Sequence, residues 1–165
     1  MHVDQDRKEV AVKLVYASAH AGALDEVSAL AAQAKLGTAS SIVSRLGDAV
    51  RTFELRMPQL AVRGYAVQLK IVGVSLDQLG AGDGSGVEKT LFAADAAIVI
   101  AEDRATVDRI RALVAAAGTT GPIAVVATAP VDGVDAAMLA ATGRAGLQAV
   151  LKPLMAELGK QLPGE

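Results

Sequence analysis

The spacing of apolar and polar residues along the chain predicts strands and helices in alternation. Continuous apolar runs rich in Val and Ile are typical of strands buried on both faces. Such runs cover residues 10–17, 95–101 and 122–127. Apolar residues at helical spacing predict longer helices over 25–34, 105–117 and 146–158. Strands separated by helices favour a parallel sheet that carries helices on both faces.

Two further runs alternate between apolar and polar residues. Residues 50–57 alternate and meet Pro58, where we expect the strand to stop. Residues 65–74 alternate again, with Val67, Leu69 and Ile71 on one side and polar residues on the other. The two runs predict an antiparallel hairpin at the edge of the sheet, with one face exposed to water.

Local signals mark several helix ends and loops. Asp103 is placed to cap the helix 105–117, and Gly118 to close it. Pro153 predicts a kink in the last helix, because proline donates no hydrogen bond to the helix. We expect a loop over the glycine-rich residues 80–86 and a short helix over 87–94. Two polar segments remain open. Residues around 41–46 could form a short helix or a loop, and 129–145 a short helix, an extra strand or a loop.

Length and composition fit one α/β domain. The chain has 165 residues, enough for one proper core. Hydrophobic residues make up 52 % but aromatic residues only 2 %, so Ala, Val, Leu and Ile must build that core. We expect a single domain over 1–165, with residues 1–8 disordered and 160–165 forming a frayed tail.

Charge and cysteine content exclude several classes of function. The net charge is −2 and the isoelectric point is about 5.7, so there is no electrostatic footprint for nucleic acid. No apolar run approaches the roughly 20 residues needed to cross a bilayer. The absence of cysteine excludes disulfides, thiolate catalysis and cysteine-bound metal. These features predict a cytoplasmic domain without membrane insertion or nucleic-acid partners.

The order of elements resembles the Ras-like small GTPases, and short stretches resemble the bacterial gliding-motility (MglA-like) branch. They are Lys13-Leu-Val-Tyr16, Thr52-Phe-Glu-Leu-Arg-Met-Pro58, Arg63-Gly-Tyr65 and Leu91-Phe-Ala-Ala-Asp-Ala-Ala-Ile-Val-Ile100, with Ala141-Thr-Gly-Arg-Ala-Gly-Leu147 before the last helix. The matches run over nearly the whole chain from about residue 10. The resemblance implies a three-layer fold with a mostly parallel sheet, one antiparallel edge strand and helices on both faces.

The residues that bind phosphate in that family are not present at the matching positions of this chain. The phosphate-binding loop needs glycines for close backbone approach, a Lys for the β- and γ-phosphates and a Ser or Thr for magnesium. Aligned from Lys13, the Lys position falls on Leu24 and the Ser/Thr position on Asp25. The first and last glycines are replaced by Ser18 and Ala23. An aspartate at the start of the helix would repel phosphate, and leucine supplies no charge.

The family's other nucleotide contacts fail as well. Leu76 stands where a phosphate-sensing glycine is expected, and Asp77 stands where a glutamine would orient water. The guanine-selecting Asn-Lys-x-Asp is replaced by Thr128-Ala-Pro-Val131, and Asp132 comes one position late. The interval before Ala141 is short, so the family's penultimate helix is expected to be reduced or missing. We therefore interpret the loop 17–25 as a nucleotide site that has been lost.

The resemblance then implies a pseudo-GTPase that acts as a protein-interaction or scaffold module and is not an enzyme. No catalytic residue, metal site or cofactor is expected. The expected partner is a roadblock-type regulator or a true small GTPase, and self-association stays open. The candidate contact surface follows the hairpin edge and the switch-like segment: Phe53, Leu55, Met57, Leu60, Val62, Tyr65, Leu76 and Leu79. Ordinary core packing is the alternative role for these residues.

The residues also allow other functions. The loop 17–25, with Ser18, His20 and the amides near Gly22, could serve a divergent nucleotide or small-molecule sensor. The glycines at 80–86 resemble a dinucleotide loop, but they follow an edge hairpin, so a loop without a ligand is favoured. His20 has no recognisable nucleophile or orienting carboxylate beside it. Glu102 and Asp103 end a central strand, where helix capping is favoured over catalysis.

Overall fold

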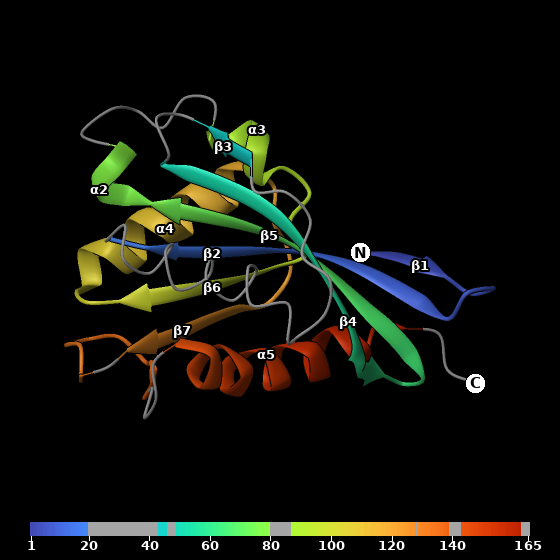
Figure 1. Ribbon diagram of the computed structural model, residues 1–165. Helices are drawn as coiled ribbons and strands as arrows, with labels where there is room; N and C mark the ends of the chain where they lie inside the picture. The colour runs from blue at the N-terminus through green and yellow to red at the C-terminus, as the bar shows by residue number, and fades with distance from the viewer. Residues whose placement is uncertain (20–42, 46–48, 80–86, 128, 139–142, 163–165) are drawn as a thin grey trace.

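A computed structural model describes residues 1–19, 43–45, 49–79, 87–127, 129–138 and 143–162. The described chain forms a twisted α/β structure around one mixed sheet (Figure 1). Seven strands follow the order β3-β4-β5-β2-β6-β7-β8, and an eighth, β1, pairs with β2.

The strands from β5 to β8 are parallel and form the larger part of the sheet. They are β5 (Tyr65–Ser75), β2 (Glu9–Ser18), β6 (Ala96–Ala101), β7 (Ile123–Ala127) and β8 (Ala137–Met138). The antiparallel strands are β4 (Val50–Val62) beside β5, β3 (Val43–Arg45) beside β4, and β1 (His2–Asp4) beside β2. A mixed, mostly parallel sheet with an antiparallel hairpin was predicted. Strands β1 and β3 add two antiparallel pairs that the sequence did not predict.

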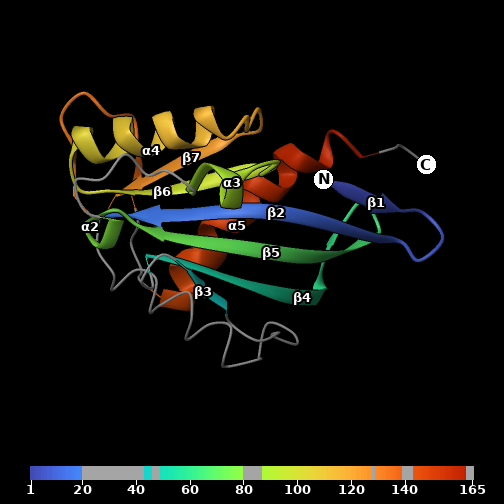
Figure 2. The ribbon, with the colours of Figure 1, turned by 90° about the horizontal axis from the view of Figure 1, so that it is seen from above.

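Helices cover both faces of the sheet, as predicted (Figure 2). Leu14, Leu69 and Ile98 point to one face, where they pack with Leu154 and Leu158 of α5 (Gly143–Gly159). On the other face, the apolar cluster joins strand residues to three helices: α2 (Leu76–Leu79), α3 (Val87–Leu91) and α4 (Arg104–Ala116). Alternate residues of β2 thus enter two separate cores.

Helix α4 begins and ends where the sequence predicts. The Asp103 carboxylate accepts a hydrogen bond from the Thr106 backbone N–H at 2.7 Å. Gly118 follows the helix with φ of +76°, and its N–H donates to Ala115 O at 2.9 Å. Val107, Ile110 and Val114 are buried against the sheet. Asp103 therefore acts as the N-cap of a helix whose position follows from its apolar stripe.

Both chain ends differ from prediction. Residues 1–8 are not disordered: His2–Asp4 forms β1, which pairs with Glu9–Ala11 through backbone contacts. This strand is short and polar, so its apolar pattern gave no signal. After α5, Leu162 is only 4 % exposed and packs in the α5-side core, so residues 160–162 are not a frayed tail.

Strand β4 does not stop at Pro58, contrary to prediction. It runs on to Val62, and its register against β5 shifts between Met57 and Ala61. An irregularity of this kind accommodates a proline without a ladder hydrogen bond. The hairpin turn is Arg63–Gly64, with φ of +48° and +79°. Positive φ at both positions suits the tight turn that joins twisted antiparallel strands.

The two segments left open become partly defined. Residues 43–45 form strand β3 instead of a helix. Residues 129–136 form turns and irregular backbone before the two-residue strand β8, so the described part of this interval contains no helix. The short helix predicted over 87–94 ends at Leu91.

Candidate functional site

The parallel strands end together at one edge of the sheet, where ligand sites of α/β proteins gather. Strand β2 ends at Ser18 and β5 ends at Ser75, and both serines are buried. Strand β6 ends at Ala101 and is followed by Glu102 and Asp103, which are exposed. This edge is therefore the first candidate site, and the segment 17–25 begins there.

At this edge, the start of the loop is hydrogen bonded to the segment after β5. The Asp77 backbone N–H donates to Ala19 O at 2.9 Å, and the Ser75 hydroxyl donates to the same oxygen at 3.4 Å. Leu76, between them, is 4 % exposed and packs in the core on the α4 side. The backbone of residues 75–77 is thus attached to the end of β2 and anchored by a buried side chain.

Asp103 has a structural role at the same edge. The hydrogen bond from the Thr106 backbone N–H holds the pKa of the Asp103 carboxyl below its usual range, and the Thr106 hydroxyl adds to the effect. A carboxylate that accepts these bonds stays ionised and caps the helix. Capping was the favoured interpretation from the sequence.

The candidate contact residues separate into groups. Tyr65 is 5 % exposed and Leu76 is 4 % exposed, so both belong to the core and cannot form a contact surface. Val62 and Leu79 are half-buried against the two cores. The side chains of Phe53, Leu55, Met57 and Leu60, on β4, lie outside the described side chains, as do residues 20–42 with His20, Gly22, Leu24 and Asp25, and the glycine-rich loop 80–86.

The sequence did not single out Phe92 as a surface residue. Phe92 follows α3 and is 68 % exposed, although aromatic residues are scarce in this chain. Met138, on the last strand of the sheet order, β8, is 56 % exposed. Val87 and Leu91 are four residues apart, so they share the buried face of a helix. Phe92 is one position further and therefore lies off that face. That spacing was the available signal.

A hollow of about 320 Å³ lies beside the amino-terminal half of β2, where Ala11, Val12 and Lys13 line it. Its charged lining residues are Lys13, Glu54, Lys70 and Asp95. Its other lining residues are Met1, His2, Ala11, Val12, Gln68 and Ala93. No pattern along the sequence indicates this hollow, because it depends on which residues of neighbouring strands stand side by side.

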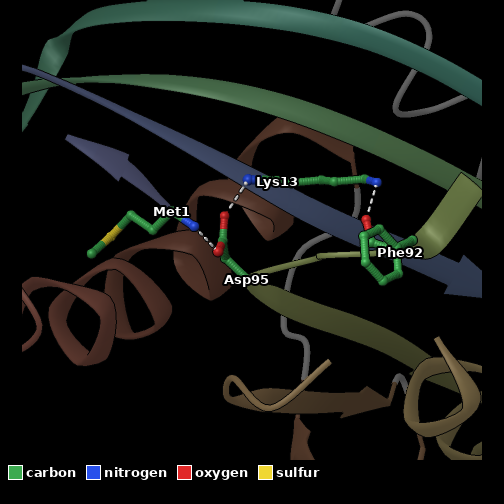
Figure 3. Close-up of polar contacts among 4 residues, drawn as sticks. All are labelled: Met1, Lys13, Phe92 and Asp95. Atoms are coloured by element: carbon green, nitrogen blue, oxygen red, sulfur yellow. Dashed lines mark hydrogen bonds and ion pairs between the residues drawn. The ribbon is translucent and has the colours of Figure 1, made fainter. Parts of the chain in front are cut away.

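Asp95, just before β6, contacts β2 and the residue that precedes β1 (Figure 3). One carboxylate oxygen accepts a hydrogen bond from the Lys13 backbone N–H at 2.9 Å, and the other contacts the Met1 amino group. The Asp95 N–H donates in turn to Lys13 O at 2.8 Å. Asp95 therefore fills the place where β1 has ended and β6 has not yet begun.

Lys13 lines the hollow, and its Nζ donates to the Phe92 carbonyl oxygen (Figure 3). Burial lowers the pKa of Lys13, and the nearby charge of Lys70 lowers it further, against the opposing effect of Asp95. The Lys13 and Lys70 backbones are register partners on adjacent parallel strands. The hollow thus holds two like charges side by side.

Within the described residues, no group of three or more His, Cys, Asp or Glu side chains is placed to hold a metal ion. None of the helices in the described ranges has the length and apolar character required to cross a membrane. Comparison with known proteins found no matching family model and no matching curated protein.

Proposed function

We propose that this chain is a catalytically inactive Ras-like domain of the MglA-like type, a pseudo-GTPase that works as a protein-interaction or scaffold module. The proposal starts from the resemblance of short stretches and element order. It is supported by the strand order, in which the first long strand, β2, lies between β5 and β6, and by the antiparallel hairpin strand β4. Fold alone does not establish function, so a local observation has to carry the proposal.

That observation is the attachment of residues 75–77 to the end of β2. In a GTPase switch, the segment after this strand is ordered by the γ-phosphate and released on hydrolysis. Here Leu76 occupies the phosphate-sensing position and is buried in the core. The Asp77 N–H is already bonded to Ala19 O. A segment already held by protein contacts has less to gain from a nucleotide, so we expect it to stay in one state.

The expected partners are a roadblock-type protein or a true small GTPase, as the resemblance implies. Half-buried Leu79 at the end of α2 and half-buried Val62 on β4 remain candidates for the contact surface. Exposed Phe92 joins them, because an exposed aromatic residue is a frequent interface anchor. Tyr65 and Leu76 no longer belong to the proposed surface.

Nucleotide titration tests the loss of the site. Thermal-shift and calorimetric titrations would use GTP, GDP, ATP and ADP, each with and without magnesium. A ligand at a hundred times its dissociation constant stabilises a fold by about 2.7 kcal/mol. We expect no shift in melting temperature at millimolar nucleotide. A magnesium-dependent shift would contradict the proposal and favour the divergent nucleotide sensor at loop 17–25.

Partner binding is tested with surface variants. A roadblock-type protein from the same source would be titrated against wild type, Phe92→Ser and Leu79→Ala. Weaker binding at an unchanged melting temperature would support the contact surface. Leu113→Ala is the matched control for Leu79, because Leu113 is also half-buried against the same core but lies on α4. Equal binding by all variants, or no binding by wild type, would contradict this partner assignment.

A further inference from the structure

The hollow over Lys13 lies away from the carboxyl edge of the sheet and has no role in the proposed function. Lys13 and Lys70 are register partners on β2 and β5. Each stands two residues before a valine of the α4-side core, Val15 and Val72. Side chains two apart in a strand share a face, so both lysines rise from the same face. Both line the hollow.

Like charges side by side on neighbouring strands are unfavourable. Lys13 Nζ donates to the neutral Phe92 carbonyl oxygen, a contact that does not offset the charge of either lysine. The ammonium group of lysine has three donors, so Lys13 retains capacity to donate. An oxyanion between the two lysines would relieve the repulsion and accept charge-assisted hydrogen bonds.

The acidic neighbours restrict what fits. Glu54 is the register partner of Lys70 on β4, and Asp95 lies on the other side of Lys13. Both Asp95 oxygens are engaged, one by the Lys13 N–H and one by the Met1 amino group. Across the sheet, the two lysines therefore lie in the middle, with Glu54 beyond Lys70 and Asp95 beyond Lys13. A single oxyanion group matches the central pair, whereas an extended polyanion would also meet the flanking acids.

Shape supports a small ligand. Ala11 and Ala93 have short side chains and line the hollow together with the neutral polar residues Gln68 and His2. The volume of about 320 Å³ is at the lower end of the range for small-molecule sites. We propose that this hollow, built on the Lys13–Lys70 pair, binds the phosphoryl or carboxylate group of a small anionic metabolite.

Titration of the full chain with inorganic phosphate and with succinate, at constant ionic strength, tests the site. Backbone amide NMR would follow residues 11–13 and 68–70. We expect saturable shifts there with at least one of the two anions. Absence of saturable shifts with both anions would overturn the proposal. So would shifts confined to Ala17 and Ser18, because those residues lie at the carboxyl edge.

Variants make the assignment specific. Lys13→Met and Lys70→Met keep an apolar stem and remove one charge, so each should weaken binding about tenfold or more. Glu54→Gln should strengthen binding, because it removes a flanking negative charge. Lys152→Met is the control, since Lys152 is exposed on α5, across the sheet. If Lys13→Met fails to fold, the Lys70→Met variant still tests the site, because Lys70 is exposed. Unchanged binding in Lys70→Met would overturn the proposal.

Discussion

At the scale of single residues, Asp95 shows how one carboxylate can complete a sheet. It is an intermediate-burial residue whose oxygens contact the Lys13 backbone and the Met1 amino group. The sequence predicts a strand over 95–101 that includes Asp95, whereas the strand begins at Ala96 and Asp95 lies just before it. The function of Asp95 follows only from the pairing of β2 with β6.

We expect Asp95→Ala to destabilise the fold by about 1–3 kcal/mol, because the Lys13 backbone N–H loses its acceptor. Asp95→Asn should cost less, since an amide oxygen can still accept that bond. Urea unfolding measures both. The control is Asp108→Ala, which removes an exposed ion pair with Arg104 and should change stability little. Equal losses for Asp95→Ala and Asp108→Ala would contradict this role.

Lys13 should impose a pH dependence on stability. Its pKa is lowered in the folded state by burial and by Lys70, while an unfolded lysine titrates near about 10.4. Between these values the unfolded chain binds more protons, so the free energy of unfolding rises as pH rises. Below the lowered pKa, Lys13 is charged in both states and its contribution is unfavourable throughout.

Urea midpoints from pH 7 upward would be compared for wild type and Lys13→Met. The difference between them should shift in favour of wild type as pH rises through that interval. Lys89→Met is the control, because Lys89 is exposed on α3. A constant difference across the interval would mean that Lys13 does not carry the effect.

At the scale of elements, the sequence predicts the long segments well. The apolar runs locate β2, β6 and β7, and helical spacing locates α4 and α5. These assignments succeed because each element buries a continuous or periodic apolar face. Strand β1 and the extension of β4 beyond Pro58 depend on backbone pairing with a neighbour, which no local pattern encodes.

The connection from α4 to β7 contains a glycine that has no space for a side chain. A Cβ at Gly121 would lie 1.6 Å from the Asp95 carbonyl oxygen. Gly118 has open space around it but a φ of +76°. Gly121→Ala must displace backbone, so we expect a loss of about 3 kcal/mol. Gly118→Ala should cost about 1–2 kcal/mol from its left-handed conformation.

Chemical denaturation gives the free energy of unfolding of each variant. Gly121→Ala reports the cost of steric crowding, and Gly118→Ala reports the cost of backbone strain. A smaller loss for Gly121→Ala than for Gly118→Ala would contradict the close approach of β6 to this connection. A matched surface control is Ala116→Gly, because Ala116 is exposed near the end of α4. It should cost about 1 kcal/mol or less from helix propensity.

At the scale of the whole molecule, the two cores meet along the central strands. Leu14 and Ile98 face the α5 side, and Val15 and Val99 face the α4 side. The predicted α/β class with a mostly parallel sheet agrees with these strands. The candidate sites are less accessible to prediction: the loop 17–25 could be judged by its residue types, but the Lys13–Lys70 pair requires the strand register.

Native-state hydrogen exchange should reflect this organisation. We expect amides in the middle of β2, β5 and β6, such as those of Leu14, Ile71 and Ile98, to exchange only through global unfolding. Their exchange free energies should equal the value from urea unfolding. Amides of the short edge strand β8 should exchange through smaller openings. Exchange of β2 at the rate of β8 would contradict a shared central strand.

Strand β2 also bears on aggregation. On one side it pairs with β5 along its whole length. On the other, β1 covers residues 9–11 and β6 covers 14–17, and Asp95 occupies the interval between them. An unpaired stretch of strand is a template for intermolecular pairing. The short polar strand β1 therefore covers part of the edge of β2 that would otherwise be open to intermolecular pairing.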